Sequence, residues 1–421
     1  MLMRVFVLFA ICLVVGVTSN AQNKGPLPRW EKGFLDIHHI STGRGNAAFL
    51  TFPDGTTMLI DAGDMSDTHP RTMSPRNTVR KPNDKRSPSE WIVDYIRQFM
   101  PDGKQPALDY SMITHFHDDH FGEWDETRPM SVTGNYRLFG MTGVGERVKI
   151  GTMIDRGFDF PIDLKAKASE APSKKEEFQS LREYWKFIDY QSSKNGMIHQ
   201  KLIPGAKDQI VLKKEAAKYP NFVVRNISVN GQVWTGYADN DYVSLFNIGQ
   251  YPGENPLSTC IKISYGAFDY FTGGDISGMN NIGESDATSL EAHVAPVIGP
   301  VDVATLNHHG NRDSQSPVYV RTLKPRVWVQ QVWSSDHPGE EVLRRITSES
   351  LYPGARDLFT TDMLEANRLV IGDRIDQSYR SLHGHVVVRV YDDGARYMVY
   401  VLDDLTQKRE VVASYGPYQS R

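Results

Sequence analysis

Apolar and polar positions alternate in short runs along most of the chain, a pattern that predicts many strands and few helices. Runs of four to eight residues that are rich in β-branched and aromatic side chains and end in turn residues are typical of strands. Such runs occupy residues 34–40, 47–52, 57–60, 107–114, 259–265, 268–272, 301–306 and 327–332. Near the end of the chain, residues 386–391 and 396–402 flank the turn Asp392-Asp393-Gly394 and predict a hairpin.

Two segments predict helices. Ser87 and Glu90 have the spacing of a capping box, and Pro88 suits a first helical position. The apolar residues that follow have helical spacing and predict one buried face: Ile92, Ile96, Phe99 and Met100. A second amphipathic helix is expected where four side chains share a face: Phe178, Leu181, Trp185 and Ile188. Strands that alternate with helices predict an α/β sandwich.

Residues 121–255 interrupt this pattern with long polar stretches. The region is too long for an ordinary connection, and we therefore expect an inserted subdomain or lid. The predicted organisation has three parts, which are a signal segment at 1–21, a main domain at 22–346 and a C-terminal extension at 347–421 packed on the main domain.

The first 21 residues have the composition of a secretory signal peptide. Arg4 supplies a positive charge, residues 5–17 form an unbroken apolar or small run of 13, and small residues precede Gln22. A membrane anchor is the alternative, but 13 residues fall short of the ~20 that span a bilayer. We expect an exported protein, periplasmic or extracellular, with no membrane span after removal of the signal.

Composition and charge narrow the function less than the motifs do. The chain has 421 residues, 40% of them hydrophobic, which suffices for a large core. Removal of the signal leaves Cys260 as the one cysteine, so we expect no internal disulfide and a core position for Cys260 in its predicted strand. The remaining 46 basic and 51 acidic residues give a net charge of −5. This mild acidity does not indicate a dedicated nucleic-acid binder, although it allows a local basic patch.

Residues 115–120 read His-Phe-His-Asp-Asp-His and place three imidazoles and two carboxylates in one short run. These side chains hold zinc, manganese or iron at neutral pH. On a tight loop His115 and His117 can turn to one ion, while Asp119 and His120 can serve a second ion nearby. A solvated polar loop is the alternative, but neither core packing nor solubility requires such a run. The cluster therefore predicts a metal site.

Four further polar segments follow predicted strands in the same way. Ligand sites of α/β proteins form where the carboxyl ends of strands meet, and we expect these segments to gather around the cluster. Ordinary turn chemistry is the alternative for each of them. The segments are Asp61-Ala62-Gly63-Asp64, Thr272-Gly273-Gly274-Asp275, Asn307-His308-His309-Gly310 and His337-Pro338.

With these segments in place, residues 34–346 resemble the metallo-β-lactamase-fold hydrolases, chiefly through the H-x-H-x-D-H run. Within that superfamily the chain looks like the branch that contains the extracellular domain of the competence DNA-uptake channel and secreted phosphorylcholine esterases. The segments that carry this finer resemblance are Gly43-Arg44-Gly45-Asn46, Thr272–Asp275, His308-His309-Gly310, His337-Pro338 and Thr360-Thr361-Asp362. The resemblance implies a four-layer αββα sandwich, here with an inserted subdomain and a C-terminal β-hairpin.

The resemblance also implies a site for two zinc ions, with manganese or iron as alternatives. Its metal ligands would be His115, His117, Asp119, His120, Asp275, His309 and His337. Asp275 would bridge the ions, and Asp61 would orient a ligand imidazole through its ring N–H. Of the double histidine, His309 is expected to be the ligand and His308 to face the substrate, and the opposite assignment stays open. The expected catalytic residues are Asp119, His308 and Asp61.

Two positions depart from the branch, which usually has an acid at Asn46 and often an Asp at His117. The complete histidine set favours a working dinuclear site. Arg44 and Asn46 are candidate substrate-binding residues. A basic stretch predicts either a solvated loop or a rim that attracts an anionic substrate, and it consists of Arg71, Arg76, Arg80, Lys81, Lys85 and Arg86.

The sequence therefore favours an exported hydrolase in which two metal ions activate water for attack on a phosphodiester or another phosphoester. No Ser–His or Cys–His nucleophile pair is required. A lactonase or amide hydrolase at the same site is one alternative, and a catalytically idle, metal-containing binding module is another. The expected partner is an anionic small-molecule or polymer ester, with nucleic acid possible, and the sequence does not indicate an oligomeric state.

Overall fold

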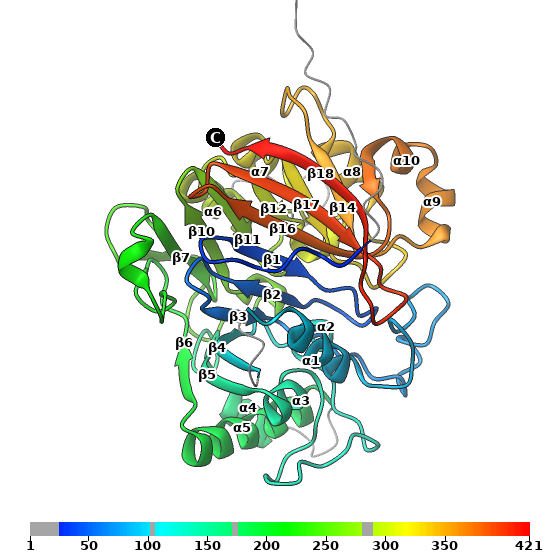
Figure 1. Ribbon diagram of the computed structural model, residues 1–421. Helices are drawn as coiled ribbons and strands as arrows, with labels where there is room; N and C mark the ends of the chain where they lie inside the picture. The colour runs from blue at the N-terminus through cyan, green and yellow to red at the C-terminus, as the bar shows by residue number, and fades with distance from the viewer. Residues whose placement is uncertain (1–24, 102–105, 171–175, 280–288) are drawn as a thin grey trace, which may run out of the picture.

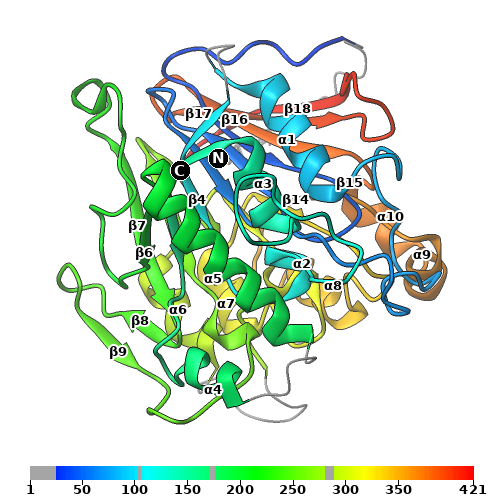
Figure 2. The ribbon, with the colours of Figure 1, turned by 90° about the horizontal axis from the view of Figure 1, so that it is seen from below.

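The structure is a computed structural model that describes residues 25–101, 106–170, 176–279 and 289–421. Within these residues the strands form two nine-stranded sheets that pack against each other, with helices on their outer faces (Figures 1 and 2). Residues 1–21, which the sequence predicts to be an export signal, lie outside the described residues.

The first sheet contains the strands that lead to the histidine cluster. Its order is β18 (Val411–Gln419), β17 (Arg396–Leu402), β16 (His385–Tyr391), β1 (Leu35–His39), β2 (Ala48–Thr51), β3 (Thr57–Ile60), β4 (Ala107–Met112), β5 (Lys149–Asp155) and β6 (Ile198–Lys201). Strands β3 to β6 run parallel, whereas the pairings from β18 to β3 are antiparallel. The carboxyl ends of β3, β4 and β5 therefore meet at one edge of this sheet.

The second sheet repeats this mixture of parallel and antiparallel strands. Its order is β15 (Tyr379–Ser381), β14 (Asp357–Thr360), β13 (Val327–Gln330), β12 (Val303–Thr305), β11 (Phe268–Thr272), β10 (Cys260–Tyr265), β7 (Phe222–Val229), β8 (Gln232–Trp234) and β9 (Tyr242–Ser244). Strands β11 to β15 run parallel, and β10, β7, β8 and β9 pair antiparallel. This sheet thus has its own row of carboxyl ends, at β11, β12 and β13.

Ten α-helices are found among the described residues. They are α1 (Pro88–Phe99), α2 (Asp118–Phe121), α3 (Gly140–Arg147), α4 (Leu164–Glu170), α5 (Glu176–Asn195), α6 (Leu290–Ile298), α7 (Pro317–Leu323), α8 (Glu340–Ile346), α9 (Glu365–Ile371) and α10 (Arg374–Ser378). The predicted capping box forms at α1, where Ser87 Oγ accepts from the Glu90 backbone N–H and Glu90 Oε2 accepts from the Ser87 N–H at 2.9 Å.

Alternate residues of the strands enter different apolar layers. In β3, Met58 and Ile60 lie in the core between the two sheets, whereas Leu59 lies in the core that α1, α3 and α5 cover. In β13, Val327 and Val329 face the other sheet, and Trp328 joins a third core under α6, α7 and α8. This alternation follows from the two-residue period of a strand, and it confirms the predicted four-layer αββα sandwich.

The regions that we expected to be added to this sandwich are built into it. Residues 121–255 supply β5 and β6 to the first sheet and β7 to β9 to the second, with α3 before β5 and with α4 and α5 between β5 and β6. Residues 347–421 supply β14 and β15 to the second sheet and β16 to β18 to the first. The predicted C-terminal hairpin is present as β16 and β17, and it pairs directly with β1. Short strands separated by polar loops gave these regions their loose pattern.

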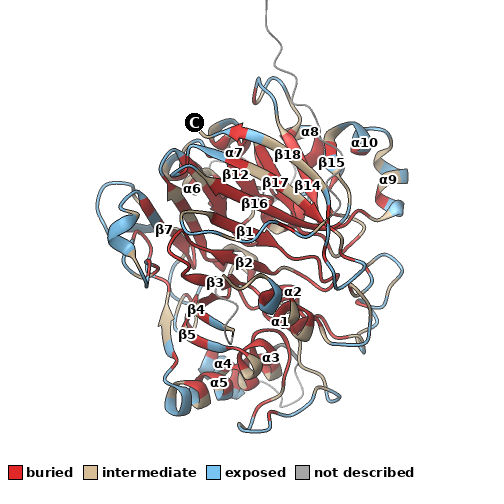
Figure 3. Cartoon of the chain, in the orientation of Figure 1, coloured by how far each residue is buried: buried red, intermediate tan, exposed pale blue. Residues whose placement is uncertain are grey.

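Burial follows the sheets, and Figure 3 shows buried residues along both of them while the outer loops are exposed. Cys260, at the start of β10, is fully buried in the outer core of the second sheet, which confirms the predicted core position. Burial raises the pKa of its thiol to about 12. Among the described helices, none combines the length and the apolar character needed to cross a membrane.

Candidate metal centre

The histidine cluster lies where β4 ends and the chain turns into α2. His115 follows the strand and is fully buried, and His117 is the partly exposed N-cap of α2. Asp119 and His120 lie within α2 and are buried. The short helix therefore aims the last two side chains inward, while His117 stays at the surface.

Tight backbone packing holds this turn in place. The Asn46 N–H donates to Asp119 O at 2.7 Å, and the Ala62 N–H donates to His120 O at 2.7 Å. A Cβ atom at Gly45, where φ is +123°, would lie 2.1 Å from Asp119 O, and one at Gly63 would lie 2.2 Å from the same oxygen. Both glycines are required because the loops that contain them touch the backbone of α2.

Two groups of metal-ligand atoms form at this edge, and each has its donor atoms within 4.8 Å of one another. We call one the buried group, which consists of Asp119, His120, Asp275 and His309. We call the other the open group, which consists of His115, His117 and Asp275. Asp275, just beyond β11, belongs to both groups, so a single carboxylate joins two potential ion sites.

The donor atoms converge as ligands of a cation do. His115 Nε2 lies 3.1 Å from His117 Nδ1, and His120 Nε2 lies 3.4 Å from His309 Nε2. Asp275 Oδ1 is buried, lacks a hydrogen bond, and lies 3.0 Å from His120 Nε2. Imidazole nitrogens and carboxylate oxygens suit Zn²⁺, Mn²⁺ or Fe²⁺. The residues present therefore fit a pair of divalent ions.

The electrostatics of the buried group favour positive charge. Burial opposes protonation of His120, but the Asp275, Asp119 and Asp61 carboxylates raise its pKa well above the ordinary value. For His309, burial is outweighed by Asp275 and Asp119, and the pKa rises to about 9. Three carboxylates thus surround these two imidazoles. A divalent cation would satisfy the same negative field.

Asp61 fixes the orientation of His120. Its backbone has a φ of +60°, and its Oδ2 accepts from His120 Nδ1 at 2.8 Å. The same carboxylate accepts from the Thr114 N–H at 2.7 Å and from Thr114 Oγ1 at 2.8 Å. Because Nδ1 is held in this way, Nε2 of His120 is the atom that points to Asp275. This contact is the usual support of a metal-binding histidine.

The two histidines of the His308-His309 run lie at different places relative to the buried group. His308 and His309 both have left-handed backbones, with φ of +46° and +56°. His309 Nδ1 donates to Gln331 O at 3.1 Å, and its Nε2 lies 2.8 Å from Asp119 Oδ2. His308 Nδ1 instead lies 2.7 Å from Asp313 Oδ1, with its Nε2 3.1 Å from Asn255 Nδ2. His309 thus joins the buried group, and His308 sits beside it.

His337 lies next to the cluster without belonging to either group. Its ring stacks on His309, with centroids 4.8 Å apart and planes at 19°, and it meets the edge of Trp333. His337 is buried and its Nδ1 has no hydrogen-bond partner. Burial, together with His309, lowers its pKa to about 3. His337 therefore lies against the two groups with a buried, unpaired ring nitrogen, and its role as a metal ligand stays a prediction.

Of the two candidate substrate-binding residues, Arg44 is held by contacts within the protein and Asn46 borders a separate small cavity. Arg44 is buried and donates to the Asp67 carboxylate at 3.0 Å and to Gly43 O at 2.9 Å. Asn46 borders a small cavity with Asp61 and Gln331, and its Oδ1 is buried without a hydrogen bond. Arg44 thus locks its loop to the segment around Asp67, and neither side chain lines the cleft beside the metal groups.

The basic stretch is largely neutralised by carboxylates from other segments. Its ion pairs are Arg71–Asp118, Arg76–Asp336, Arg80–Asp67, Lys81 with Asp362 and Asp404, and Arg86–Asp94. Lys81 is buried with both of its partners, which makes it part of the fold and not of a rim. His199, a further histidine of the 121–255 region, pairs with Asp155 at 2.8 Å and stacks on Phe158.

Sequence reasoning missed a buried ion pair that supports the open group. Glu254 Oε1 accepts from the Phe116 N–H at 3.0 Å, between His115 and His117. The same carboxylate receives Arg156 Nε at 2.6 Å and Nη2 at 2.8 Å, and the guanidinium lies over the Phe116 ring. Nothing in the local sequence marks Glu254, because it follows a Pro-Gly turn and its partners are far away in the chain.

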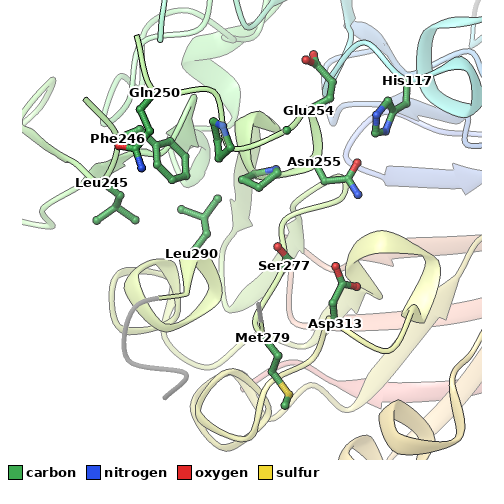
Figure 4. Close-up of a pocket in the computed structure, with 13 residues that line it drawn as sticks. His117, Leu245, Phe246, Gln250, Glu254, Asn255, Ser277, Met279, Leu290 and Asp313 are labelled. Atoms are coloured by element: carbon green, nitrogen blue, oxygen red, sulfur yellow. The ribbon is translucent and has the colours of Figure 1, made fainter. Parts of the chain in front are cut away.

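A cleft of about 660 Å³ opens onto the open group (Figure 4). It is formed by the segments before β10 and after β11, and its lining includes His117, Glu254, Asn255 and Asp313. Through Asn255 and Asp313 the cleft also reaches His308. The volume lies in the range of small-molecule sites. The open group therefore has a neighbouring space where a substrate can bind, at His117.

The comparisons with known proteins do not assign a family. No family model matches the sequence, and no curated protein matches it. Among solved structures, the chain is similar to a mutant of the CmlA beta-hydroxylase, with a TM-score of 0.36, 11% identity and coverage of 86% of this chain and 55% of that one. It is also similar to a protein of unknown function from Enterococcus faecalis, with a TM-score of 0.30, 12% identity and coverage of 82% and 64%. The chain thus spans only 55% and 64% of these two proteins, and such low scores say nothing about activity.

Proposed function

We propose that this protein is an exported, metal-dependent hydrolase with a dinuclear centre and that a phosphoester is its favoured substrate. The observation that carries the proposal is the position of Asp275 in both the buried and the open group. A carboxylate shared by two sets of imidazoles is the ligand arrangement that holds a pair of ions close together. The adjoining cleft supports turnover over a purely structural use of metal, because it gives a substrate access to His117.

His120, His309 and Asp119 would hold one ion, His115 and His117 the other, and Asp275 would contact both. Zinc is the proposed metal because imidazoles dominate the set, with manganese or iron as alternatives. The chemistry that such a pair supplies when bound is Lewis acidity, a lower pKa of water and a clamp on both oxygens of an in-line displacement at phosphorus. That clamp is why a phosphoester is favoured over a lactone or an amide.

The protein's own residues position the reacting groups and supply a proton. In the proposed reaction a water oxygen bonds to phosphorus and releases a proton to solvent, the ester P–O bond breaks, and the departing oxygen takes up a proton from the protein, which solvent then replaces. His308 Nε2 is the proposed source of that proton, because Asp313 accepts from Nδ1 at 2.7 Å and both Asp313 and Asn255, which contact the ring, line the cleft. Burial works against the protonated ring, but Asp275 and Asp313 raise the pKa of His308 above its ordinary value.

Hydrolysis assays on residues 22–421 test this proposal. Phosphodiesters, phosphomonoesters, lactones, amides and β-lactams are compared in chelated and in metal-restored protein. We expect hydrolysis of a phosphoester that chelation abolishes, that zinc or manganese restores and that Asp119→Ala reduces. Asp239→Ala serves as the control, because that exposed carboxylate pairs with Lys207 and Arg225 away from the centre. Activity that survives both chelation and Asp119→Ala would refute the dinuclear mechanism, and bound metal without any turnover would favour a binding module.

A further inference from the structure

The cleft beside the open group has two chemically different ends, which Figure 4 displays. One end holds His117, Asn255 and Asp313, next to the metal-ligand atoms and His308. The other end is walled by Leu245, Phe246 and Leu290. A substrate whose reacting ester lies at the first end must therefore place its remaining part against an apolar wall.

The apolar wall is firmly anchored. Leu245 donates its N–H to Gly231 O at 3.0 Å and packs on the outer core of the second sheet, to which Leu290 also belongs. The ring of Phe246 lies over Gly231, where an added Cβ atom would come within 2.3 Å of it. Leu290 is the first residue of α6 and is only 5% exposed. These side chains thus form a pre-shaped surface, which keeps the entropic cost of binding low.

The charges that face the cleft are compensated. No lysine or arginine occurs among its described lining residues. Glu254 is neutralised by Arg156, and Asp313 pairs with His308. The arginines of the basic stretch are engaged by carboxylates elsewhere, as Arg71 is by Asp118. The described part of the lining therefore offers no cation that would neutralise repeated phosphates, which dominate the affinity of proteins for nucleic acids.

We propose that the cleft selects a small ester whose second substituent is uncharged and apolar, of the size of an aromatic ring or a short acyl chain, and that Phe246, Leu245 and Leu290 are the specificity-determining residues. The inference rests on the proposed function, because it takes the phosphoryl group to lie at the metal groups. It excludes a polyanion such as nucleic acid as the preferred substrate. Apolar burial against the fixed wall supplies the selectivity.

Binding of phosphonates to the zinc-loaded protein tests the inference without turnover. The probes are methylphosphonate, phenylphosphonate and 4-phosphonobenzoate, which share the phosphonate anion and differ in the attached group. Calorimetry should give a Kd for phenylphosphonate at least ~10-fold lower than for either of the other two, as expected for an apolar subsite. Equal or tighter binding of 4-phosphonobenzoate, or no binding of any probe, would overturn the inference.

Two substitutions on the same loop locate the selectivity. Phe246→Lys should reverse the preference between phenylphosphonate and 4-phosphonobenzoate, because it brings a cation to the apolar end. Ile248→Lys is the matched control, since Ile248 is 88% exposed and does not line the cleft, and its preference should equal that of the unaltered protein. Identical effects of the two substitutions would contradict the assignment. Should Phe246→Lys not fold, the series on the unaltered protein decides the matter.

Hydrolysis separates this inference from the proposed function. Phenyl 4-nitrophenyl phosphate and 4-carboxyphenyl 4-nitrophenyl phosphate release the same 4-nitrophenol, and the first should have a kcat/KM at least ~10-fold higher. If neither is hydrolysed while phenylphosphonate binds selectively, the proposed function fails and the cleft assignment stands. If both are hydrolysed with the carboxylated ester preferred, the hydrolase stands and the cleft assignment fails.

Discussion

The two metal groups share Asp275 but differ in how the fold supports them. In the buried group, His120 is held by Asp61 and His309 by the Gln331 carbonyl, and all four members are buried. In the open group, His117 is partly exposed and the main support is indirect, through Glu254 and the Phe116 backbone. The difference predicts that an ion in the buried group would be held more tightly than an ion in the open group. The more accessible position is also the one that faces the cleft.

Removal of the shared carboxylate should have the largest effect. Asp275→Ala takes one oxygen ligand from each group, so both ions should be lost and kcat/KM should fall by about 10³-fold or more. Metal content after dialysis and steady-state kinetics measure this. Asp239→Ala should keep two ions. Two tightly bound ions in Asp275→Ala would show that the groups are not joined by this residue.

Substitution of one histidine from each group tests this difference in support. His309→Ala and His117→Ala should each lower the metal content from two ions to about one. His309→Ala should also destabilise the chelated protein by about 1–3 kcal/mol, because it leaves the buried Asp119 carboxylate without its partner at 2.8 Å. His117→Ala should change stability little, since its side chain is partly exposed. Metal analysis and denaturant unfolding provide the measurements, and equal destabilisation by both substitutions would contradict the comparison.

The support of the open group can be weakened without touching a ligand. In the double variant Arg156→Met, Glu254→Gln, the Phe116 N–H loses its ionised acceptor and no guanidinium is left unpaired. The affinity of the open group should fall ~10–100-fold, as for other supports of metal ligands, while the buried group keeps its ion. Competition with a chromogenic chelator measures both affinities. Glu215→Gln, at an exposed pair with Lys32, is the control and should leave them unchanged.

A pH series on the chelated protein supplies the baseline for these comparisons. His39, between β16 and Tyr270, is fully buried, and burial lowers its pKa to about 4. In the unfolded chain the same histidine has a pKa near 6.5. As the pH falls, the unfolded chain therefore takes up a proton at His39 before the folded protein does. The stability that neutral His39 contributes is complete above pH 6.5 and is lost as the pH falls toward 4, about 3 kcal/mol over the window. Denaturant unfolding should show this slope, and His39→Asn should reduce it by the share of His39 alone, because burial also lowers the pKa of His38 and of His385. The slope should persist in His69→Asn, where the substituted side chain is partly exposed.

Much of the strand framework was predictable from sequence because burial imposes a two-residue period. Strands β3, β11 and β16 begin and end within a residue of their predicted bounds. The region at 121–255 was not predictable in the same way, since β6 is partly exposed along its length and β8 and β9 are only three residues long. Such short strands become recognisable only when their pairing partners are known.

The sequence by itself determined which potential metal ligands the chain carries, and their place after apolar strands puts these imidazoles and carboxylates at one edge of the fold. Only the tertiary structure decided which charges remain available to a substrate. Lys81 meets Asp404, which lies 323 positions later in the chain, and Glu254 meets Arg156 after 98. Ion pairs of this kind depend on contacts between distant segments, and no local pattern encodes them. For the same reason, the basic stretch that suggested an anionic substrate is largely neutralised in the folded protein, and a cleft with one polar and one apolar end lies beside the open group.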